Sequence, residues 1–216
     1  MDNLQQYYQQ RAKEHEAVYE KPERQDDLEM LHVHLQELVS NANVLEIACG
    51  TGYWTKTMAK TCRSIQAIDY STSVLEIAQA KEYGNTPVTF QQQDFWKLQA
   101  PKVKYDIVFG GFIWSHIPKE KLIDFLLLLR QQIKEDGKLL FIDNRYVAGS
   151  STSISRTDKN GNTYQLRKLA DGTEYEILKN FPDHLEVLAE TIMIALDVVW
   201  SDLQYYWIGD FRNLKY

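Results

Sequence analysis

The sequence predicts an α/β domain in which a mostly parallel sheet is covered by helices on both faces. Short apolar runs alternate with amphipathic stretches between Asn43 and Asn144, which is typical of βαβ units. The chain has 216 residues, a length that suits one domain with a sizeable core. A glycine-rich turn, Ala48–Gly52, follows the first apolar run, where α/β proteins commonly bind ligands.

Five strands are expected in the first two thirds of the chain, over residues 43–48, 64–70, 87–94, 104–112 and 137–144. Helices are expected between them, over residues 53–61, 71–84 and 118–137. Two more helices precede the first strand, over residues 2–20 and from Pro22 onward, where proline and acidic residues favour a helix start.

After the fifth strand the pattern changes to a polar, loop-like segment that ends near residue 163. A β-hairpin is then expected over residues 163–181, turning at Asp171–Gly172. A helix and two terminal strands, which bring the sheet to seven strands, are expected over residues 182–195, 196–201 and 203–209. We expect a single domain over residues 1–216, with residues 1–40 as a candidate lid and residues 145–181 as an inserted candidate cap.

Composition and charge narrow the classes of partner. The net charge of −6 argues against a dominant nucleic-acid surface. The N-terminus lacks the apolar core of a signal peptide, and no apolar run approaches the length of a membrane span. The two cysteines, Cys49 and Cys62, support neither a disulfide framework nor a metal site. We expect a cytoplasmic protein that binds a small molecule and no metal, nucleic acid or membrane.

The glycines after the first strand discriminate between two nucleotide cofactors. A dinucleotide fold needs G-x-G-x-x-G, but counting from Gly50 the last glycine of that motif is replaced by Thr55. An NAD-dependent oxidoreductase is therefore not expected. The alternative pattern, an acid followed by small residues and G-x-G, fits Glu46–Gly52. Acids also end the next two expected strands, where Asp69 suits a ribose diol and Asp94 an adenine amine.

Taken together, "EIACGTG", "IDYS" and "QQDF" resemble, in order and spacing, the cofactor motifs of class I S-adenosylmethionine-dependent methyltransferases. The resemblance covers nearly the whole chain and implies a Rossmann-like fold, with S-adenosyl-L-methionine as cofactor and S-adenosyl-L-homocysteine as product. Ala48 departs from the pattern, because many members carry glycine there, but no loss of binding is expected. The implied cofactor-binding residues are Glu46, Ala48, Gly50, Gly52, Trp54, Asp69, Tyr70, Asp94, Phe95 and Gly110, with Tyr8 and Arg11 from the first helix.

The methyl acceptor is expected beyond the fourth and fifth strands. His116, in "WSHIP", is a candidate general base or, equally, a residue that orients the acceptor. The inserted segment carries cations that suit an anionic acceptor, namely Arg145, Arg156, Arg167, Lys168 and Lys179, although for each one taken alone a solvated surface position is favoured.

A narrower resemblance concerns the acceptor. "LEIACGTGYWT", "FQQQDF", "WSHIP" and "LRKLADGTEYEILKNF" are similar to small bacterial O-methyltransferases that esterify phosphonates, as in dehydrophos biosynthesis. Arg167 and Lys179 match basic hairpin positions there, and Tyr19 belongs to a tyrosine-bearing segment that closes over cofactor and acceptor. An ionised oxyanion would need no base, which would leave His116 an orienting role. The stretch "SSTSISRTDKNGNTYQ" departs from these relatives and weakens any claim to the same substrate.

The leading hypothesis is thus methyl transfer to an oxygen of a small acid, a phosphonate or carboxylate, or to a nitrogen. An RNA or protein methyltransferase is the alternative, although "GGFIW" after the fourth strand lacks the Asn/Asp-Pro-Pro-aromatic motif of amide and adenine methylation. A non-catalytic S-adenosylmethionine-binding protein would carry the same cofactor motifs. The acceptor and the oligomeric state stay open.

Overall fold

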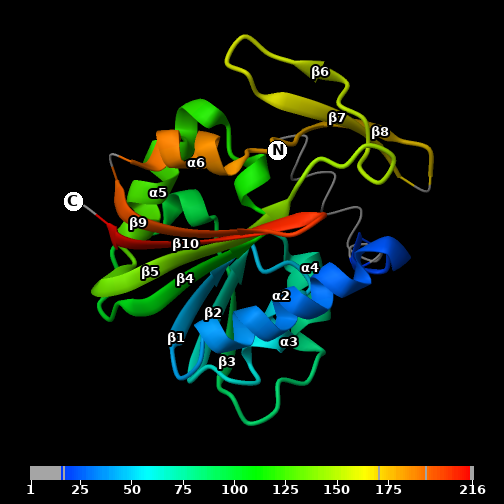
Figure 1. The fold of residues 1–216 in the computed structure, drawn as a ribbon. Helices are drawn as coiled ribbons and strands as arrows, with labels where there is room; N and C mark the ends of the chain where they lie inside the picture. Colours follow the sequence, from blue (N-terminus) through cyan, green and yellow to red (C-terminus); the bar gives the residue numbers. More distant parts are fainter. Residues whose placement is uncertain (1–15, 17, 170, 193, 215–216) are drawn as a thin grey trace.

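The structure, a computed structural model, describes residues 16, 18–169, 171–192 and 194–214. Its centre is a seven-stranded sheet in the order β3-β2-β1-β4-β5-β10-β9 (Figure 1). The strands span Asn43–Ile47 (β1), Ser64–Asp69 (β2), Val88–Gln92 (β3), Tyr105–Gly111 (β4), Ile133–Asn144 (β5), Ala195–Asp202 (β9) and Tyr206–Leu214 (β10). The first five run parallel, and β10 runs antiparallel to both of its neighbours. The predicted seven-stranded, mostly parallel sheet is confirmed.

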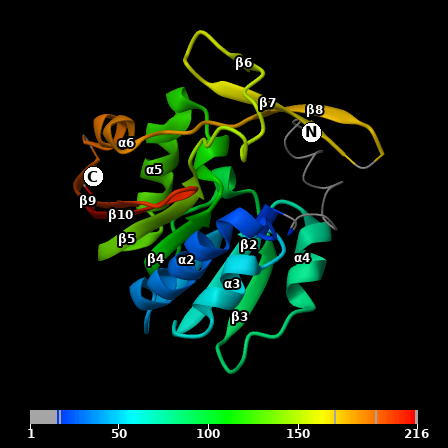
Figure 2. The same cartoon turned by 45° about the vertical axis from the view of Figure 1, so that its right-hand side comes forward.

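Helices cover both faces of this sheet, as predicted (Figures 1 and 2). The helices on one face are α2 (Gln25–Leu38), α3 (Tyr53–Met58) and α4 (Thr72–Gln79). The helices on the other face are α5 (Leu122–Arg130) and α6 (His184–Thr191). Two apolar cores, one on each side of the sheet, hold these layers together. Among the described residues, no helix combines the length and apolar character needed to cross a membrane.

The expected helix over residues 118–137 is wrong in its second half. The chain forms a short 3₁₀ turn, η5 (Lys119–Lys121), then α5, and β5 begins at Ile133. The reason is tertiary: the Tyr105 N–H donates to the Gln132 carbonyl at 2.9 Å, and Ile133, fully buried, pairs with Tyr105 across the sheet. A partner strand thus outweighs the local preference of a polar segment.

The inserted segment forms a second, three-stranded sheet (Figure 2). The predicted hairpin is confirmed as β7 (Thr163–Lys168) and β8 (Glu174–Leu178), and Gly172 supplies the positive φ of its turn. A third strand, β6 (Arg156–Thr157), lies within the stretch that was expected to be a loop. Just after β8, the Asn180 N–H donates to the Ser115 carbonyl at 2.8 Å, which ties this sheet to the carboxyl end of β4.

Candidate functional site

A cavity of about 910 Å³ lies at the carboxyl ends of the parallel strands and extends to the inserted sheet. Its volume is at the upper end of the range for small-molecule sites. Twelve of the residues predicted from the sequence line it: Tyr19, Glu46, Ala48, Gly50, Trp54, Asp69, Tyr70, Asp94, Phe95, His116, Arg167 and Lys179. The predicted residues Tyr8 and Arg11 lie outside the described part of the chain.

Two predicted cofactor residues, Gly52 and Gly110, do not line the cavity. Gly52 has φ +79°, and a Cβ there would lie 2.4 Å from the Tyr83 hydroxyl. A Cβ on Gly110 would lie 2.7 Å from Ile113. Both glycines therefore shape the backbone behind the cavity wall, and the neighbouring Gly111 lines the cavity in place of Gly110.

Asp69 joins the turn after β1 to the turn after β2. Its Oδ2 accepts from the Gly50 N–H at 2.9 Å, and its Oδ1 accepts from the Ser71 N–H at 2.8 Å. Burial raises the pKa of Asp69, against these two hydrogen bonds, which lower it. Each carboxylate oxygen keeps a second lone pair for a ligand hydroxyl. The carboxylate can therefore serve the loop and a ribose diol together.

Glu46 is more deeply buried in the protein than the neighbouring acid Asp69, and its protonation state differs from that of an ordinary glutamate. Its side chain is 2 % exposed, and its Oε2 accepts from the Thr55 hydroxyl at 2.5 Å. Burial, with a contribution from the Asp69 charge, raises the pKa of Glu46 to about 8. The side chain is therefore largely protonated at neutral pH, and a ligand cation beside it would favour ionisation.

The third acid is placed by a short helical turn. Asp94 caps η3 (Phe95–Lys97), because its Oδ1 accepts from the Trp96 N–H at 3.0 Å. The Phe95 ring packs edge-on against Phe125, with ring centroids 5.6 Å apart. Asp94 and Phe95 thus lie together at the end of β3, on the same cavity wall as Tyr70 after β2.

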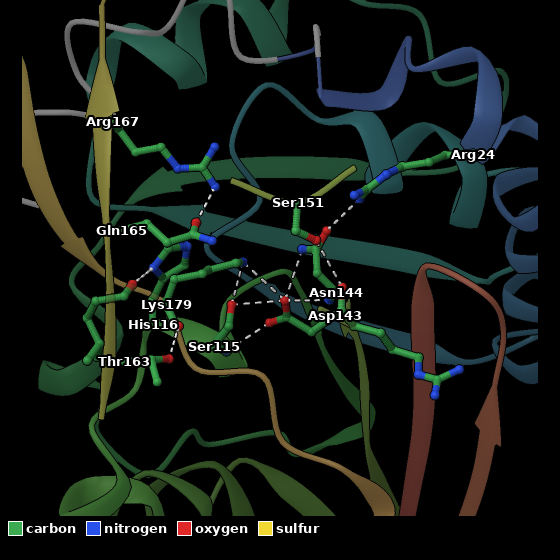
Figure 3. Close-up of polar contacts among 12 residues, drawn as sticks. Arg24, Ser115, His116, Asp143, Asn144, Ser151, Thr163, Gln165, Arg167 and Lys179 are labelled. Atoms are coloured by element: carbon green, nitrogen blue, oxygen red, sulfur yellow. Dashed lines mark hydrogen bonds and ion pairs between the residues drawn. The ribbon is translucent and has the colours of Figure 1, made fainter. Parts of the chain in front are cut away.

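The acceptor side of the cavity contains a buried ion pair that sequence reasoning did not find. Lys179 Nζ lies 3.3 Å from Asp143 Oδ1 and donates to Ser115 Oγ at 2.6 Å (Figure 3). Burial alone would raise the pKa of Asp143, but Lys179 and the backbone amides of Ser115 and Asn144 outweigh burial, so the pKa is lowered. Ser115 and Asp143 lie in the segments "GGFIWSHIP" and "IDNRY", where the acceptor site was expected, but no local pattern indicated that they would meet Lys179.

His116 is neutral and oriented by the inserted sheet. It ends η4 (Trp114–His116), and its Nδ1 lies 2.7 Å from the Leu178 carbonyl, so Nδ1 carries the proton. Burial, with Lys179 contributing, lowers the pKa of His116 to about 3. A neutral imidazole can accept a proton at Nε2, but this low pKa makes it a weak base.

Arg24 is a cavity residue that the sequence did not reveal. It ends η2 (Pro22–Arg24), directly before α2, and its side chain is 3 % exposed. Its Nε and Nη2 donate to Ser150 Oγ at 3.1 and 3.0 Å, and its Nη1 donates to Asn144 Oδ1 at 3.2 Å. A single arginine at the start of an acidic helix gives no signal in the sequence. Figure 3 shows Arg24 and Arg167 reaching toward the ion pair from different elements.

Of the other cations in the inserted segment, only Arg167 lines the cavity in the described structure. Arg167 lines the cavity and donates to Thr152 Oγ1 at 2.9 Å and to Gln165 Oε1 at 2.7 Å. Arg156 instead binds Glu176 with both Nε and Nη2, and Arg145 Nε lies 3.5 Å from Asp202. Neither of these two, nor Lys168, lines the cavity, so the hypothesis that they bind the acceptor is not supported.

The described residues of the N-terminal segment, from Glu16 onward, contact the cofactor side of the cavity. The Tyr19 ring stacks on Tyr53 with centroids 3.6 Å apart, and it lines the cavity. Glu16 Oε1 accepts from the Thr51 hydroxyl at 2.7 Å and also pairs with Lys81. These contacts place the segment against the turn after β1. They are compatible with the predicted lid, which stays a prediction.

Comparison with known proteins connects this geometry to a family. The fold matches two solved structures at 24% sequence identity, described as "DhpI-SAH complex structure" and "DhpI-SAM-HEP complex". The first has a TM-score of 0.78 and covers 96% of this chain and 93% of DhpI. The second has a TM-score of 0.76 and covers 97% and 96%. At this identity the likeness shows the fold alone. Residues 44–137, from β1 into β5, also match the methyltransferase domain family. The resemblance to class I S-adenosylmethionine-dependent methyltransferases that the sequence predicted is confirmed.

Sequence relatives agree with this methyltransferase assignment. An uncharacterized methyltransferase of Staphylococcus carnosus is 26% identical over 178 residues, covering 81% of each chain. A malonyl-[acyl-carrier protein] O-methyltransferase of Halalkalibacterium halodurans is 33% identical over 105 residues, which cover 45% of this methyltransferase and only 37% of the relative. The predicted enzyme class is confirmed, and with it S-adenosylmethionine, the methyl donor of class I methyltransferases.

Proposed function

We propose that this methyltransferase transfers a methyl group to an oxygen of a small anionic acceptor, a phosphonate or a carboxylate. The observation that carries the proposal is the guanidinium of Arg24, which is buried and lines the cavity. It hydrogen-bonds the neutral side chains of Ser150 and Asn144, it also contacts Tyr206, and none of the described carboxylates lies within ion-pair distance of it. The exposed Glu23 carboxylate acts on it from farther away, beside Ser150. A buried charge without a counter-ion is costly, and an anionic ligand would remove that cost.

The surrounding charges support the same conclusion. Burial and then Arg24 lower the pKa of Lys21, whose ammonium donates to the Ser150 carbonyl. Burial also lowers the pKa of Lys179, and Arg167 and Arg24 oppose its charge while Asp143 supports it. The cations of the cavity therefore repel one another, with Asp143 as the buried carboxylate among them. An acceptor anion would relieve this repulsion, whereas a protonated amine acceptor would add to it.

The residues of the other cavity half fit S-adenosylmethionine. Asp69 and Asp94 present hydrogen-bond acceptors to a ribose diol and an adenine amine, and Glu46 lies where a methionine ammonium would approach the turn after β1. Gly50 and Ala48, which has φ +50°, carry little or no side chain, so a ligand can approach the backbone of that turn closely. When bound, S-adenosylmethionine supplies an electrophilic methyl group, and attack by an already ionised oxygen requires no proton transfer.

The chain's own task is then to hold the acceptor oxygen in line and to exclude water. Arg24, Arg167 and Lys179 would bind the anion, and His116, neutral and fixed by Leu178, would orient it. Named relatives support oxygen as the acceptor atom. They include the malonyl-[acyl-carrier protein] O-methyltransferase and a ubiquinone biosynthesis O-methyltransferase of Actinobacillus pleuropneumoniae, which is 28% identical over 167 residues.

The test combines cofactor titration with an acceptor screen. S-adenosylhomocysteine binding would be measured by calorimetry, and methyl transfer would be assayed on small phosphonates, carboxylates and amines. We expect Arg24→Gln to bind S-adenosylhomocysteine as the wild type does but to lose about tenfold or more in kcat/KM for the anion. Arg156→Gln is the matched control, because its guanidinium binds Glu176 outside the cavity.

Three outcomes would contradict the proposal. Methylation of amines but not of anions would assign the wrong acceptor atom. An Arg24→Gln variant with unchanged kinetics would remove the observation on which the anion depends. Cofactor binding without transfer to any acceptor would favour a non-catalytic binding protein.

A further inference from the structure

Phe112 lies between the cofactor half and the acceptor half of the cavity. It is the first residue after β4, and β4 lies between β1 and β5 in the sheet. The carboxyl end of β4 therefore separates the side of Glu46 from the side of Asn144, the last residue of β5. Phe112 itself lines the cavity.

The backbone of Phe112 is strained. Its φ of +62° lies in the left-handed region, which bulky residues avoid, and the two residues before it are glycines that could adopt it without strain. The Phe112 N–H donates to the Ile142 carbonyl at 2.7 Å, and this hydrogen bond to β5 holds the strained backbone in place. A phenylalanine at such a position suggests that its ring has a role that outweighs the strain.

The ring links the acceptor cations to the N-terminal segment. Its centroid lies 5.5 Å from those of Tyr19 and Tyr206, with nearly parallel planes. Lys179 Nζ lies 6.0 Å from the Phe112 centroid, and the Arg24 guanidinium lies 5.5 Å from the Tyr206 centroid. Aromatic faces attract cations at these distances. Phe112 and Tyr206 thus form one aromatic surface that carries both cations.

We propose that Phe112 is a positioning residue for the anionic acceptor, an inference that rests on the proposed function. Its ring holds the Lys179 ammonium on the acceptor side and blocks the acceptor from moving toward the cofactor side. The left-handed backbone of Phe112 directs its ring into the cavity at the end of β4. The ring also packs against Tyr19 and Trp54, but the hydrogen bonds that would hold the cofactor come from Asp69, Asp94 and the turn after β1. Removal of the ring should therefore misalign the acceptor oxygen while cofactor affinity is retained.

The experiment uses the full chain, with methylphosphonate as the probe anion. Phe112→Tyr keeps the aromatic face, Phe112→Leu keeps most of the volume, and Phe112→Gly removes the side chain and relieves the strain. We expect Phe112→Tyr to keep wild-type kinetics, and the other two to lose about a hundredfold in kcat with unchanged affinity for S-adenosylhomocysteine. Phe112→Gly should also melt no lower than Phe112→Leu, although both turn over more slowly.

Asn41→Gly is the matched control for strain. Asn41 has φ +58° in an exposed turn outside the cavity, so this substitution should leave the kinetics unchanged. Wild-type kinetics in Phe112→Leu would overturn the inference and leave the proposed function intact. A parallel loss of S-adenosylhomocysteine affinity would show a general structural role and would also overturn it. A wild-type protein that binds S-adenosylhomocysteine but neither binds nor methylates any anion would overturn the proposed function and this inference together.

Discussion

The Lys179 ammonium lies 3.3 Å from Asp143 Oδ1; Lys179 lines the cavity, and Asp143 is fully buried behind it. The pair joins the end of β8 to the end of β5, so the inserted sheet is held to the main sheet at the acceptor site itself. Burial lowers the pKa of Lys179, and Asp143 opposes that effect. One carboxylate therefore helps both to attach the inserted sheet and to keep its lysine charged.

Asp143→Asn tests this coupling. Removal of one partner from a buried pair leaves an uncompensated charge, so we expect a loss of about 3–5 kcal/mol in the free energy of unfolding. The pKa of Lys179 should fall further, and anion affinity should then decline at a lower pH than in the wild type. Urea unfolding and anion titrations at several pH values measure both effects. Asp202→Asn, which breaks the exposed pair with Arg145, should cost about 0–1 kcal/mol.

The raised pKa of Glu46 leads us to expect that the free energy of unfolding falls as pH rises. Its pKa is raised from 4.5 to about 8, so the native state retains a proton that the unfolded state releases. The contribution to stability is complete below pH 4.5 and is lost as pH rises toward 8. The slope from this group is at most about 1.4 kcal/mol per pH unit.

Urea unfolding between pH 5 and 8 measures the Glu46 contribution, and Glu46→Gln should flatten the curve over that interval. Equal slopes in the two proteins would show that Glu46 titrates normally. Calorimetry of S-adenosylmethionine binding at pH 7 in two buffers of different ionisation enthalpy should also show proton release by the wild type. The Glu46→Gln variant should show none.

We expect the pH dependence of kcat/KM to show no inflection from His116. Because its pKa is lowered to about 3, the imidazole stays neutral throughout the pH range of a kinetic assay. His116→Asn retains a donor for the Leu178 carbonyl and should lower kcat/KM by about tenfold, less than the 10²–10⁴ expected from the loss of a general base. A larger loss, together with a new dependence on pH, would restore His116 as the base.

We expect substitution of Ala48 by glycine to raise the free energy of unfolding. Its φ of +50° costs a residue with a Cβ about 1 kcal/mol relative to glycine. Ala48→Gly should therefore raise the free energy of unfolding by about that amount, measured by urea denaturation. Affinity for S-adenosylmethionine should stay the same, because the backbone is already in the required conformation. Lower stability would mean that the methyl group of Ala48 makes packing contacts that outweigh the strain.

Asp69 predicts a combined loss of stability and cofactor affinity. Asp69→Ala removes the acceptor of the Gly50 and Ser71 amides, and hydrogen bonds to a charged group contribute about 1.5–3 kcal/mol each. We expect lower thermal stability and weaker S-adenosylmethionine binding. Asp69→Asn should recover part of the stability but not the affinity, because an amide offers only one acceptor oxygen to a ribose diol. Unchanged calorimetric affinity in either variant would reject the predicted role.

Several elements could be predicted because their signals are local. The strands from Asn43, Ser64 and Val88 are short apolar runs bounded by turns, and each was located within a few residues. The same logic failed at Ile133–Gly137, where a polar stretch extends β5. Its strand conformation depends on Tyr105, which pairs with Ile133 from the neighbouring strand and is invisible to a local pattern.

The alternation of strands and helices, the cofactor motifs and the strand ends that carry Asp69 and Asp94 can be derived from the sequence alone. These features depend on residues close together in the chain, so periodicity and turn chemistry encode them. The acceptor side, by contrast, depends on the folded structure, which brings Arg24, Phe112 and Lys179 to one cavity and buries Asp143 behind Lys179. Their meeting depends on sheet order and on the burial that shifts their charges, and both are set by contacts between segments far apart in the chain.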